Sequence, residues 1–223
     1  MNKNNLLLKN PIIIQFYRFI KVLFYKFFYG TSFYKLKYSA NTKNFLDSNT
    51  KYLLVTCHNG GGGTVTYLKN KYKNKSHVII LRNAKTADKD YLYSLENADS
   101  KRIIFIKPKD IKFLENSLNA IHVLSLESYM SLNFLLKWFA SLSLPITYDL
   151  HDFHCIWYEA HFIHNEKYLL EDEVKKSVLH YAFKKITFED LHSVWNNFFP
   201  YVHKINAFSQ SSKEIFSHYF PDL

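Results

Sequence analysis

The sequence predicts an α/β fold, with a Rossmann-like, doubly wound parallel sheet and helices on both of its faces. Three observations favour it. Of the 223 residues, 48% are apolar, which allows a sizeable core. Short apolar runs alternate with helical patterns from residue 51 onward, and four consecutive glycines follow the first of these runs. We therefore expect one domain over residues 51–223, preceded by a basic, aromatic and helical segment over residues 1–50.

Strands and helices are expected to alternate along this domain. Strands are expected over residues 52–57, 78–81, 102–106, 121–126, 145–150 and 205–208, with a short or edge strand over 91–95. Helices are expected over residues 65–73, 110–119, 130–142 and 171–185. Thr187 with Asp190 resembles a capping box that begins a further helix. Ser211 with Glu214 resembles a better one for the final helix, which ends before Pro221. This alternation is typical of a parallel sheet with right-handed crossovers.

The N-terminal segment allows two interpretations. Pro11 and Gly30 predict a helix over residues 12–29 that is apolar and aromatic on most of its surface. Three cations interrupt the apolar stretch too often for a comfortable membrane span: Arg18, Lys21 and Lys26. The helix either packs on the domain or on a neighbouring chain, or it lies in the interface of an anionic membrane. Because only two cysteines occur, we expect a cytoplasmic chain. The second interpretation of the helix places the chain peripherally at the inner face of the membrane.

The net charge of +10 favours anionic partners, which include phosphate-bearing substrates and membrane surfaces. Nucleic acid is not an expected partner, because no Arg-rich run, RNA-binding aromatic motif or zinc-finger spacing occurs.

The glycine run Gly60–Gly63 is the strongest local signal for a binding site. It follows the first strand and precedes the first helix, so it lies at the carboxyl edge of the expected sheet. Backbone N–H groups of such a loop can approach an anion or a sugar closely, and the helix N-terminus adds a favourable dipole. An ordinary flexible turn is the alternative. The run has neither the Gly-Lys-Ser/Thr of a P-loop nor the spaced glycines of a dinucleotide site, and we expect no cofactor.

A histidine-rich segment begins where the strand over residues 145–150 ends. His151 and Asp152 come first, followed by further possible zinc ligands: His154, Cys155, His161 and His164. Three interpretations compete: a zinc site, histidines satisfied by local hydrogen bonds, and a substrate-facing His151 whose ring is oriented by Asp152 or a backbone carbonyl. We favour the third, because these spacings without a second cysteine pair are a weak zinc signal.

Two polar residues, Ser209 and Gln210, follow the last strand and point toward the same crevice. We expect them to contact ligand in addition to any role at the helix end, whereas Ser211 is expected to act as a helix cap only.

Three segments carry a family resemblance: His58-Asn-Gly-Gly-Gly-Gly-Thr64, Leu150-His-Asp-Phe153, and Phe208-Ser-Gln-Ser-Ser-Lys-Glu-Ile-Phe216 with the following His218-Tyr-Phe-Pro221. Together they resemble the N-terminal domain of GT-B fold glycosyltransferases, especially glycosyltransferase family 4, over about residues 51–221. The chain departs from that family where Ile156 follows an early Cys155, since a Cys-Pro is common there.

The resemblance implies a single domain of the GT-B N-terminal type, with the C-terminal donor-binding domain absent. The family transfers a sugar with retention and without metal, from a nucleotide sugar to a glycan or lipid-linked acceptor, and this domain mainly holds the acceptor. Gly60, Gly61, Gly62, Gly63 and Thr64 would border the diphosphate, and His151 would lie near the reacting centre. A second polypeptide would supply the donor site. The alternatives are a truncated, non-catalytic domain that binds a glycan or a partner, and a zinc-dependent hydrolase.

Replacing Gly61 or Gly62 with Val is expected to abolish binding of a nucleotide or phosphate ligand, because the new side chain blocks close approach of the backbone. The circular dichroism spectrum is expected to stay native. A collapsed fold, with no ligand found for the unaltered chain, would show that the loop is structural.

Overall fold

A computed structural model describes residues 45–58, 63–83, 93–126, 132–156 and 184–223, and the short strands at 163–164, 167–168 and 178–181. The expected N-terminal helix and Gly60–Gly62 lie outside the described residues. No helix in the described part of the chain is long and apolar enough to cross a membrane.

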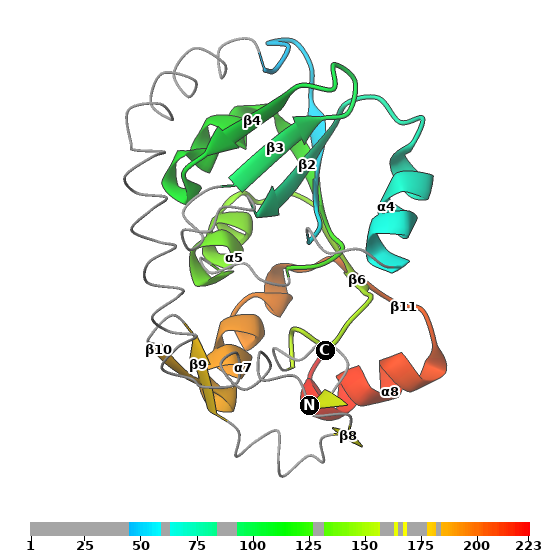
Figure 1. The fold of residues 1–223 in the computed structure, drawn as a ribbon, viewed down its shortest axis with the longest axis vertical. Coiled ribbons are helices and arrows are strands. Elements are labelled where there is room, and N and C mark those ends of the chain that lie inside the picture. The colour runs from blue at the N-terminus through cyan, green and yellow to red at the C-terminus, as the bar shows by residue number, and fades with distance from the viewer. Residues whose placement is uncertain are drawn as a thin grey trace, which may run out of the picture.

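The core of the fold is a seven-stranded, mostly parallel sheet (Figure 1). Its strands are β1 (Tyr52–Thr56), β2 (Val78–Asn83), β3 (Tyr93–Asn97), β4 (Ile103–Ile106), β5 (Leu118–Val123), β6 (Ile146–Leu150) and β11 (Lys204–Ala207). Their order is β11-β6-β5-β1-β2-β3-β4. The first five of these, from β11 to β2, are parallel, and this confirms the mixed α/β class with a largely parallel sheet.

The expectation that residues 102–106 join the parallel set is wrong. β4 pairs antiparallel with β3, and β3 pairs antiparallel with β2. Only residues 98–102 connect β3 to β4, and a parallel crossover needs about a dozen residues or more. The three strands therefore form a meander at one edge of the sheet.

Both faces of the parallel strands are covered by helices (Figure 1). Alternate residues of β1 face opposite sides, so Leu54 belongs to one core cluster and Val55 to the other. On the Val55 side lies α4 (Gly63–Tyr72), and on the Leu54 side lie α5 (Leu132–Ser141), α7 (Phe188–Asn196) and the 3₁₀ helix η1 (Pro108–Ser117). The larger cluster also takes in residues of α8 (Gln210–Tyr219).

An aromatic cluster joins α7 and α8 to β6. Phe199, in the short 3₁₀ helix η2 (Phe199–Tyr201), contacts Tyr148 of β6 at 5.5 Å and Phe220 at 4.9 Å between ring centroids. Trp195 of α7 lies 5.6 Å from the same Tyr148 ring. These rings are all nearly inaccessible to solvent, so they anchor the C-terminal part of the chain to the sheet.

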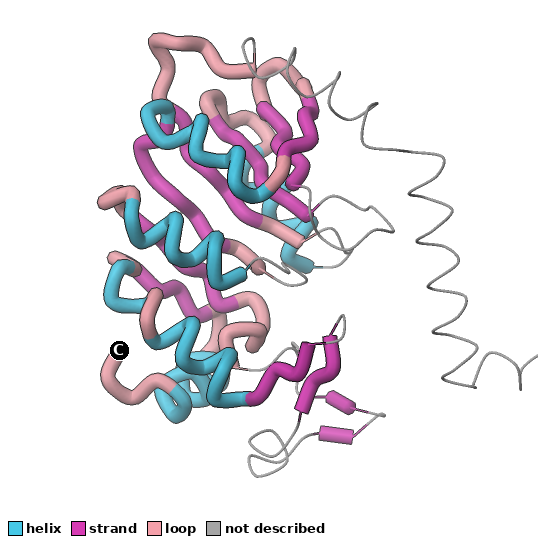
Figure 2. The backbone as a smooth tube through the Cα atoms, turned by 90° about the vertical axis from the view of Figure 1, so that its left-hand side faces the viewer, coloured by secondary structure: helices cyan, strands magenta, loops and turns pink. Residues whose placement is uncertain are grey.

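Two expected helices differ in the structure. Part of the helix expected over residues 171–185 is replaced by the antiparallel pair β9 (Val178–Tyr181) and β10 (Lys184–Thr187), which leads directly into α7 (Figure 2). A further short antiparallel pair consists of β7 (Ile163–His164) and β8 (Lys167–Tyr168). The expected helix over 110–119 is a 3₁₀ helix that ends at Ser117, because Leu118 already has extended backbone and begins β5.

The capping predictions for the last two helices have different outcomes. Thr187 and Asp190 form the expected capping box of α7. The capping box of Ser211 with Glu214 is wrong, because α8 begins two residues earlier than that box requires. Ser209 has an extended backbone and is the N-cap, and its Oγ accepts a hydrogen bond of 3.0 Å from the backbone N–H of Ser212.

Ser209→Ala is expected to destabilise the protein by about 1 kcal/mol, because it leaves an amide of the first helical turn without its partner. Ser211→Ala is the matched control, and its effect is expected to stay within about 0.5 kcal/mol because the residue is exposed. Urea denaturation of both variants measures the difference. Equal stability of the two would contradict the cap assignment.

Candidate functional site

The candidate site lies where the order of the parallel strands reverses. From β1 the chain passes to β2 on one side, while β5, β6 and β11 lie on the other side. The carboxyl ends of strands at such a reversal border a crevice in open α/β sheets. The helix that follows β1 is α4, and its first residue, Gly63, is exposed. Apart from its chain neighbours and the backbone of α4, no atom of the described residues lies within 4 Å of the position that a Cβ would take.

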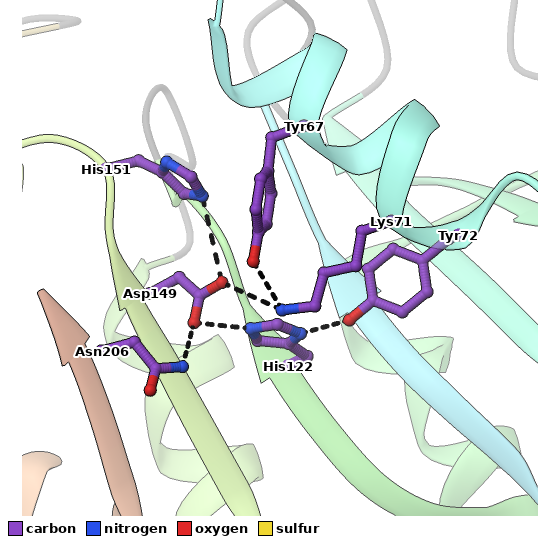
Figure 3. A network of polar contacts seen from close by, with 7 residues as sticks. All are labelled: Tyr67, Lys71, Tyr72, His122, Asp149, His151 and Asn206. Atoms are coloured by element: carbon purple, nitrogen blue, oxygen red, sulfur yellow. Dashed lines mark hydrogen bonds and ion pairs between the residues drawn. The ribbon is translucent and has the colours of Figure 1, made fainter. Parts of the chain in front are cut away.

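A carboxylate at the centre of this region connects three strands and a helix (Figure 3). Asp149 of β6 is 1% exposed. Its Oδ1 lies 2.8 Å from Nε2 of His122 in β5, and it accepts a hydrogen bond of 2.6 Å from Nδ2 of Asn206 in β11. Its Oδ2 lies 3.4 Å from Nζ of Lys71 in α4. We call Asp149 and these three partners the Asp149 network.

Two tyrosines of α4 extend the network. The hydroxyl of Tyr72 is hydrogen-bonded to Nδ1 of His122. Nζ of Lys71 donates a hydrogen bond of 2.6 Å to the hydroxyl of Tyr67. Burial, and next the charge of Asp149, raise the pKa of Tyr72, so this phenol stays protonated at neutral pH. The helix is thereby held to the sheet by polar contacts as well as by its apolar side chains.

Asp149 is ionised. Burial by itself would raise its pKa, but the hydrogen bonds from His122 and Asn206 and the charge of Lys71 outweigh burial and hold the pKa well below its usual range. The chain therefore keeps a fixed negative charge beneath α4, on the face of the sheet that α4 covers and close to the point where the strand order reverses.

His151 sits immediately above this charge. Its ring stacks on Phe208 at 4.4 Å and meets the edge of Tyr67 at 4.6 Å, and its side chain is 13% exposed. Its Nε2 lies 4.0 Å from Oδ2 of Asp149, which is an electrostatic contact rather than a hydrogen bond. Burial lowers the pKa of His151, and the charges of Asp149 and Asp152 offset that effect only in part. The ring is therefore neutral at pH 7.

Asp152, one of the two groups expected to orient His151, contacts other residues in the structure. Asp152 accepts a hydrogen bond of 3.0 Å from the Ser125 hydroxyl and one of 3.1 Å from the backbone N–H of His154. Each of its two oxygens is thus engaged, and it ties the loop after β6 to the loop after β5. The carboxylate near His151 Nε2 belongs to Asp149, two residues earlier.

The other expected ligand residues gather at the same edge only in part. Gly63 and Thr64 form the first turn of α4. Ser209 and Gln210 are exposed at the start of α8, where Gln210 Nε2 donates to Glu214 Oε1 at 2.9 Å. His161 and the side chain of His164 lie outside the described residues. Within the described part of the chain, no three His, Cys, Asp or Glu side chains are arranged to hold a metal ion.

The two cysteines are buried and unpaired with each other. Burial raises the pKa of Cys57 to about 11 and raises that of Cys155 further still, so both are neutral thiols at pH 7. Neither has the thiolate character of a nucleophile.

Sequence reasoning missed His122, Asp149 and Lys71. A signal was present, because His122 and Asp149 each interrupt an apolar strand of the buried parallel sheet, where charged residues are rare unless they are paired.

No protein-family model, curated protein or solved structure matches the chain.

Asp149→Ala is expected to destabilise the protein by about 3 kcal/mol or more, because it leaves buried partners without their counter-charge. Asp99→Ala, which removes the exposed contact with His77, is the control and is expected to cost about 1 kcal/mol or less. The folded pKa of Asp149 is lowered, so its contribution is present above the unfolded pKa of about 3.9 and is lost as pH falls below that value. Urea titrations over a pH series should show the free energies of unfolding of the unaltered chain and of Asp149→Ala converging in acid. A difference that stays constant with pH would contradict the assignment.

Proposed function

We propose that the chain supplies the acceptor-side half of a GT-B type glycosyltransferase, built on a Rossmann-like, doubly wound domain. In this proposal it helps to transfer a sugar from a nucleotide sugar to a glycan or lipid-linked acceptor. A second domain, on the same or another polypeptide, supplies the donor site.

One observation carries the proposal: three segments that are far apart in the sequence meet at one edge of the sheet. Tyr67 of α4, His151 after β6 and Phe208 after β11 form a single set of ring contacts, and Tyr67 lies 5.5 Å from Phe208. His151 and Phe208 belong to two of the segments that resemble the glycosyltransferase family, and Tyr67 lies three residues after the third segment, residues 58–64, in α4. Their meeting supports a shared ligand site over the carboxyl ends of β1, β6 and β11.

The chemistry available at this edge suits a sugar and a diphosphate. The N-terminus of α4 carries a partial positive charge, and the first amides of any helix have no partner within the helix, which favours an anion at Gly63 and Thr64. A neutral His151 can hydrogen-bond a hydroxyl group, and Phe208, which is 52% exposed, offers a flat apolar face beside it. In the proposed reaction the amides stabilise the leaving diphosphate as its charge develops.

A binding domain without catalytic activity is the second candidate, and the exposed ring of Phe208 at the edge of the site favours it. Such a domain would hold a glycan or a partner subunit through the same surface. Detection of turnover separates the two candidates.

We further propose that the chain is cytoplasmic and attaches to the inner face of the membrane through residues 12–30. Each cation near an anionic lipid surface contributes about 1 kcal/mol to this attachment. Flotation with anionic liposomes is expected for the full chain and not with neutral liposomes. Equal flotation after deletion of residues 1–38 would contradict the proposal.

The chain by itself is expected not to transfer sugar at a useful rate, because one domain cannot hold both reactants in place. Correct positioning of two reactants lowers an activation barrier by roughly 7–11 kcal/mol. The test incubates the purified chain with a panel of sugar nucleotides and glycan acceptors, with and without a candidate donor-domain protein. Turnover only in the combined reaction, and its loss in His151→Gln, is expected. Robust turnover by the chain alone would overturn the division of roles.

A further inference from the structure

We propose that the outer edge of β4 binds an extended segment of a partner protein, which adds a further strand to the sheet. The segment that fits this edge has apolar side chains at alternate positions and acidic residues at both ends. β4 and β11 are the two outermost strands of the seven-stranded sheet, so this surface lies at the opposite edge from Phe208. The inference uses no residue of the candidate site and stands independently of the proposed function.

The backbone of β4 is the first observation. β4 is the last strand of the sheet and, among the described residues, pairs with β3 alone (Figure 1). The N–H of Asn97 donates a hydrogen bond of 2.9 Å to the carbonyl of Arg102, and hydrogen-bonded residues alternate along an antiparallel pair. Ile104 therefore bonds to β3, whereas the backbone N–H and C=O groups of Ile103 and Phe105 point away from it. These groups form an open edge in the described part of the chain.

The side chains of the same two residues are apolar and exposed. Ile103 is 54% exposed and Phe105 is 46% exposed, and as alternate residues of a strand they share one face. Ile103 lies opposite Glu96 of β3, which lies opposite Ile80 of β2, so this is the face on which α4 packs. No residue of β4 belongs to the apolar cluster beneath α4, so the helix leaves this part of the face uncovered. Edge strands are commonly protected by a charge, a proline or a bulge, and β4 contains none of these.

An added strand satisfies this edge better than a lipid surface does. A lipid surface would cover the two apolar side chains but would leave the outward N–H and C=O groups of β4 without hydrogen bonds. An added strand pairs with these backbone groups, and its alternate side chains lie beside Ile103 and Phe105 on the same face. Both features of the edge therefore favour an extended peptide.

The residues that flank β4 indicate the charge of this peptide. Lys101 and Arg102 precede the strand, Lys107 and Lys109 follow it, and all four are exposed. Lys107 has an extended backbone, so it continues the alternation of the strand and lies on the face of the two exposed apolar side chains. Acidic residues at the ends of a bound peptide would lie close to these cations.

The acidic residues of β3 and of the turn that follows it are engaged elsewhere. Glu96 Oε2 accepts a hydrogen bond of 2.7 Å from Nη1 of Arg82. Asp99 Oδ2 accepts one of 2.8 Å from the backbone N–H of His77 and lies 3.4 Å from Nδ1 of the same residue. The surroundings of β4 therefore stay positively charged.

A second copy of this chain fits the edge poorly. If Ile104 faced its counterpart in an antiparallel pair, Lys101 of each copy would lie opposite Lys107 of the other. Like charges directly opposite each other destabilise a pair of strands. Each copy also carries a net charge of +10, so a partner of opposite charge is favoured.

The test measures binding of a fluorescein-labelled peptide, Glu-Asp-Val-Thr-Ile-Thr-Val-Asp-Glu, to the full chain by fluorescence anisotropy. We expect saturable binding. N-methylation of the Val and Ile amides is expected to abolish it, because residues on the same face as Ile103 and Phe105 donate their N–H groups to β4. N-methylation of the two Thr amides, which face away from β4, is the matched control and should leave binding nearly unchanged.

Variants of the chain test the edge from the other side. Phe105→Pro removes an outward N–H and the ring, and it is expected to abolish binding while the circular dichroism spectrum stays native, because proline is tolerated on the free side of an edge strand. Phe105→Val keeps the amide and should still bind. Lys107→Glu should weaken binding by about fivefold and should strengthen binding of a peptide with lysines at both ends. Lys204→Glu, at an exposed position of β11, should change neither.

Equal binding of the two methylated peptides, or no binding of the unmodified peptide, would overturn the proposal, and neither result depends on a variant that folds. Flotation on phosphatidylserine vesicles that Phe105→Pro weakens, without peptide binding, would assign the edge to a lipid surface instead. A dimer in sedimentation that the same variant dissociates would assign it to a second copy. Because none of these measurements involves a sugar or a nucleotide, their failure is distinguishable from failure of the proposed function.

Discussion

The buried charge of Asp149 is the constraint on which the arrangement of the candidate site depends. Removing a carboxylate from water costs several kcal/mol, which only close and well-placed partners can offset. Those partners come from β5, β11 and α4. The charge is thus compensated only when three neighbouring strands and the helix above them are all in place. A local change in any of these elements therefore reaches the others through one carboxylate.

The same constraint explains the unequal faces of the sheet. On the α5 side the strands contribute an almost wholly apolar cluster, extended by the rings around Phe199. On the α4 side the apolar cluster is small, and the sheet beyond it carries His122, Asp149 and Asn206 in adjacent strands. We infer that α4 is held on the sheet partly by polar contacts with the Asp149 network, in place of some of the apolar contacts that usually hold a helix on a sheet. This fixes the helix and the end of the glycine run relative to His151, and that relation is what a ligand spanning the two would need.

The sequence predicted the elements that have a strong local pattern. Apolar runs located five parallel strands, and Thr187 with Asp190 located the start of α7. It did not predict the direction of β3 and β4, because the pairing of strands depends on the length of the connection and on distant partners. It placed His151 just after the strand over residues 145–150, but it named Asp152 or a backbone carbonyl as the group that orients the ring, since Asp152 is adjacent in sequence. In an extended strand alternate residues share a face, so Asp149, two positions before His151, is the one on the same side. His122 and Lys71 become its neighbours only through the fold.

The solvent exposure of the side chains rises from Asp149, at the inner end of the site, to Phe208 at its outer edge. Asp149 is fully enclosed, the His151 side chain is 13% exposed, that of Lys71 is 30% exposed and Phe208 is 52% exposed. Electrostatic contacts weaken as water approaches, so the inner carboxylate holds its partners firmly while the outer groups act in a higher effective dielectric. A surface that closed over Phe208 would exclude water from His151 and strengthen its attraction to Asp149 without moving either residue. The part of the site that holds charge is thus already built into the sheet, and in the proposed function the part that excludes water is supplied by the second domain.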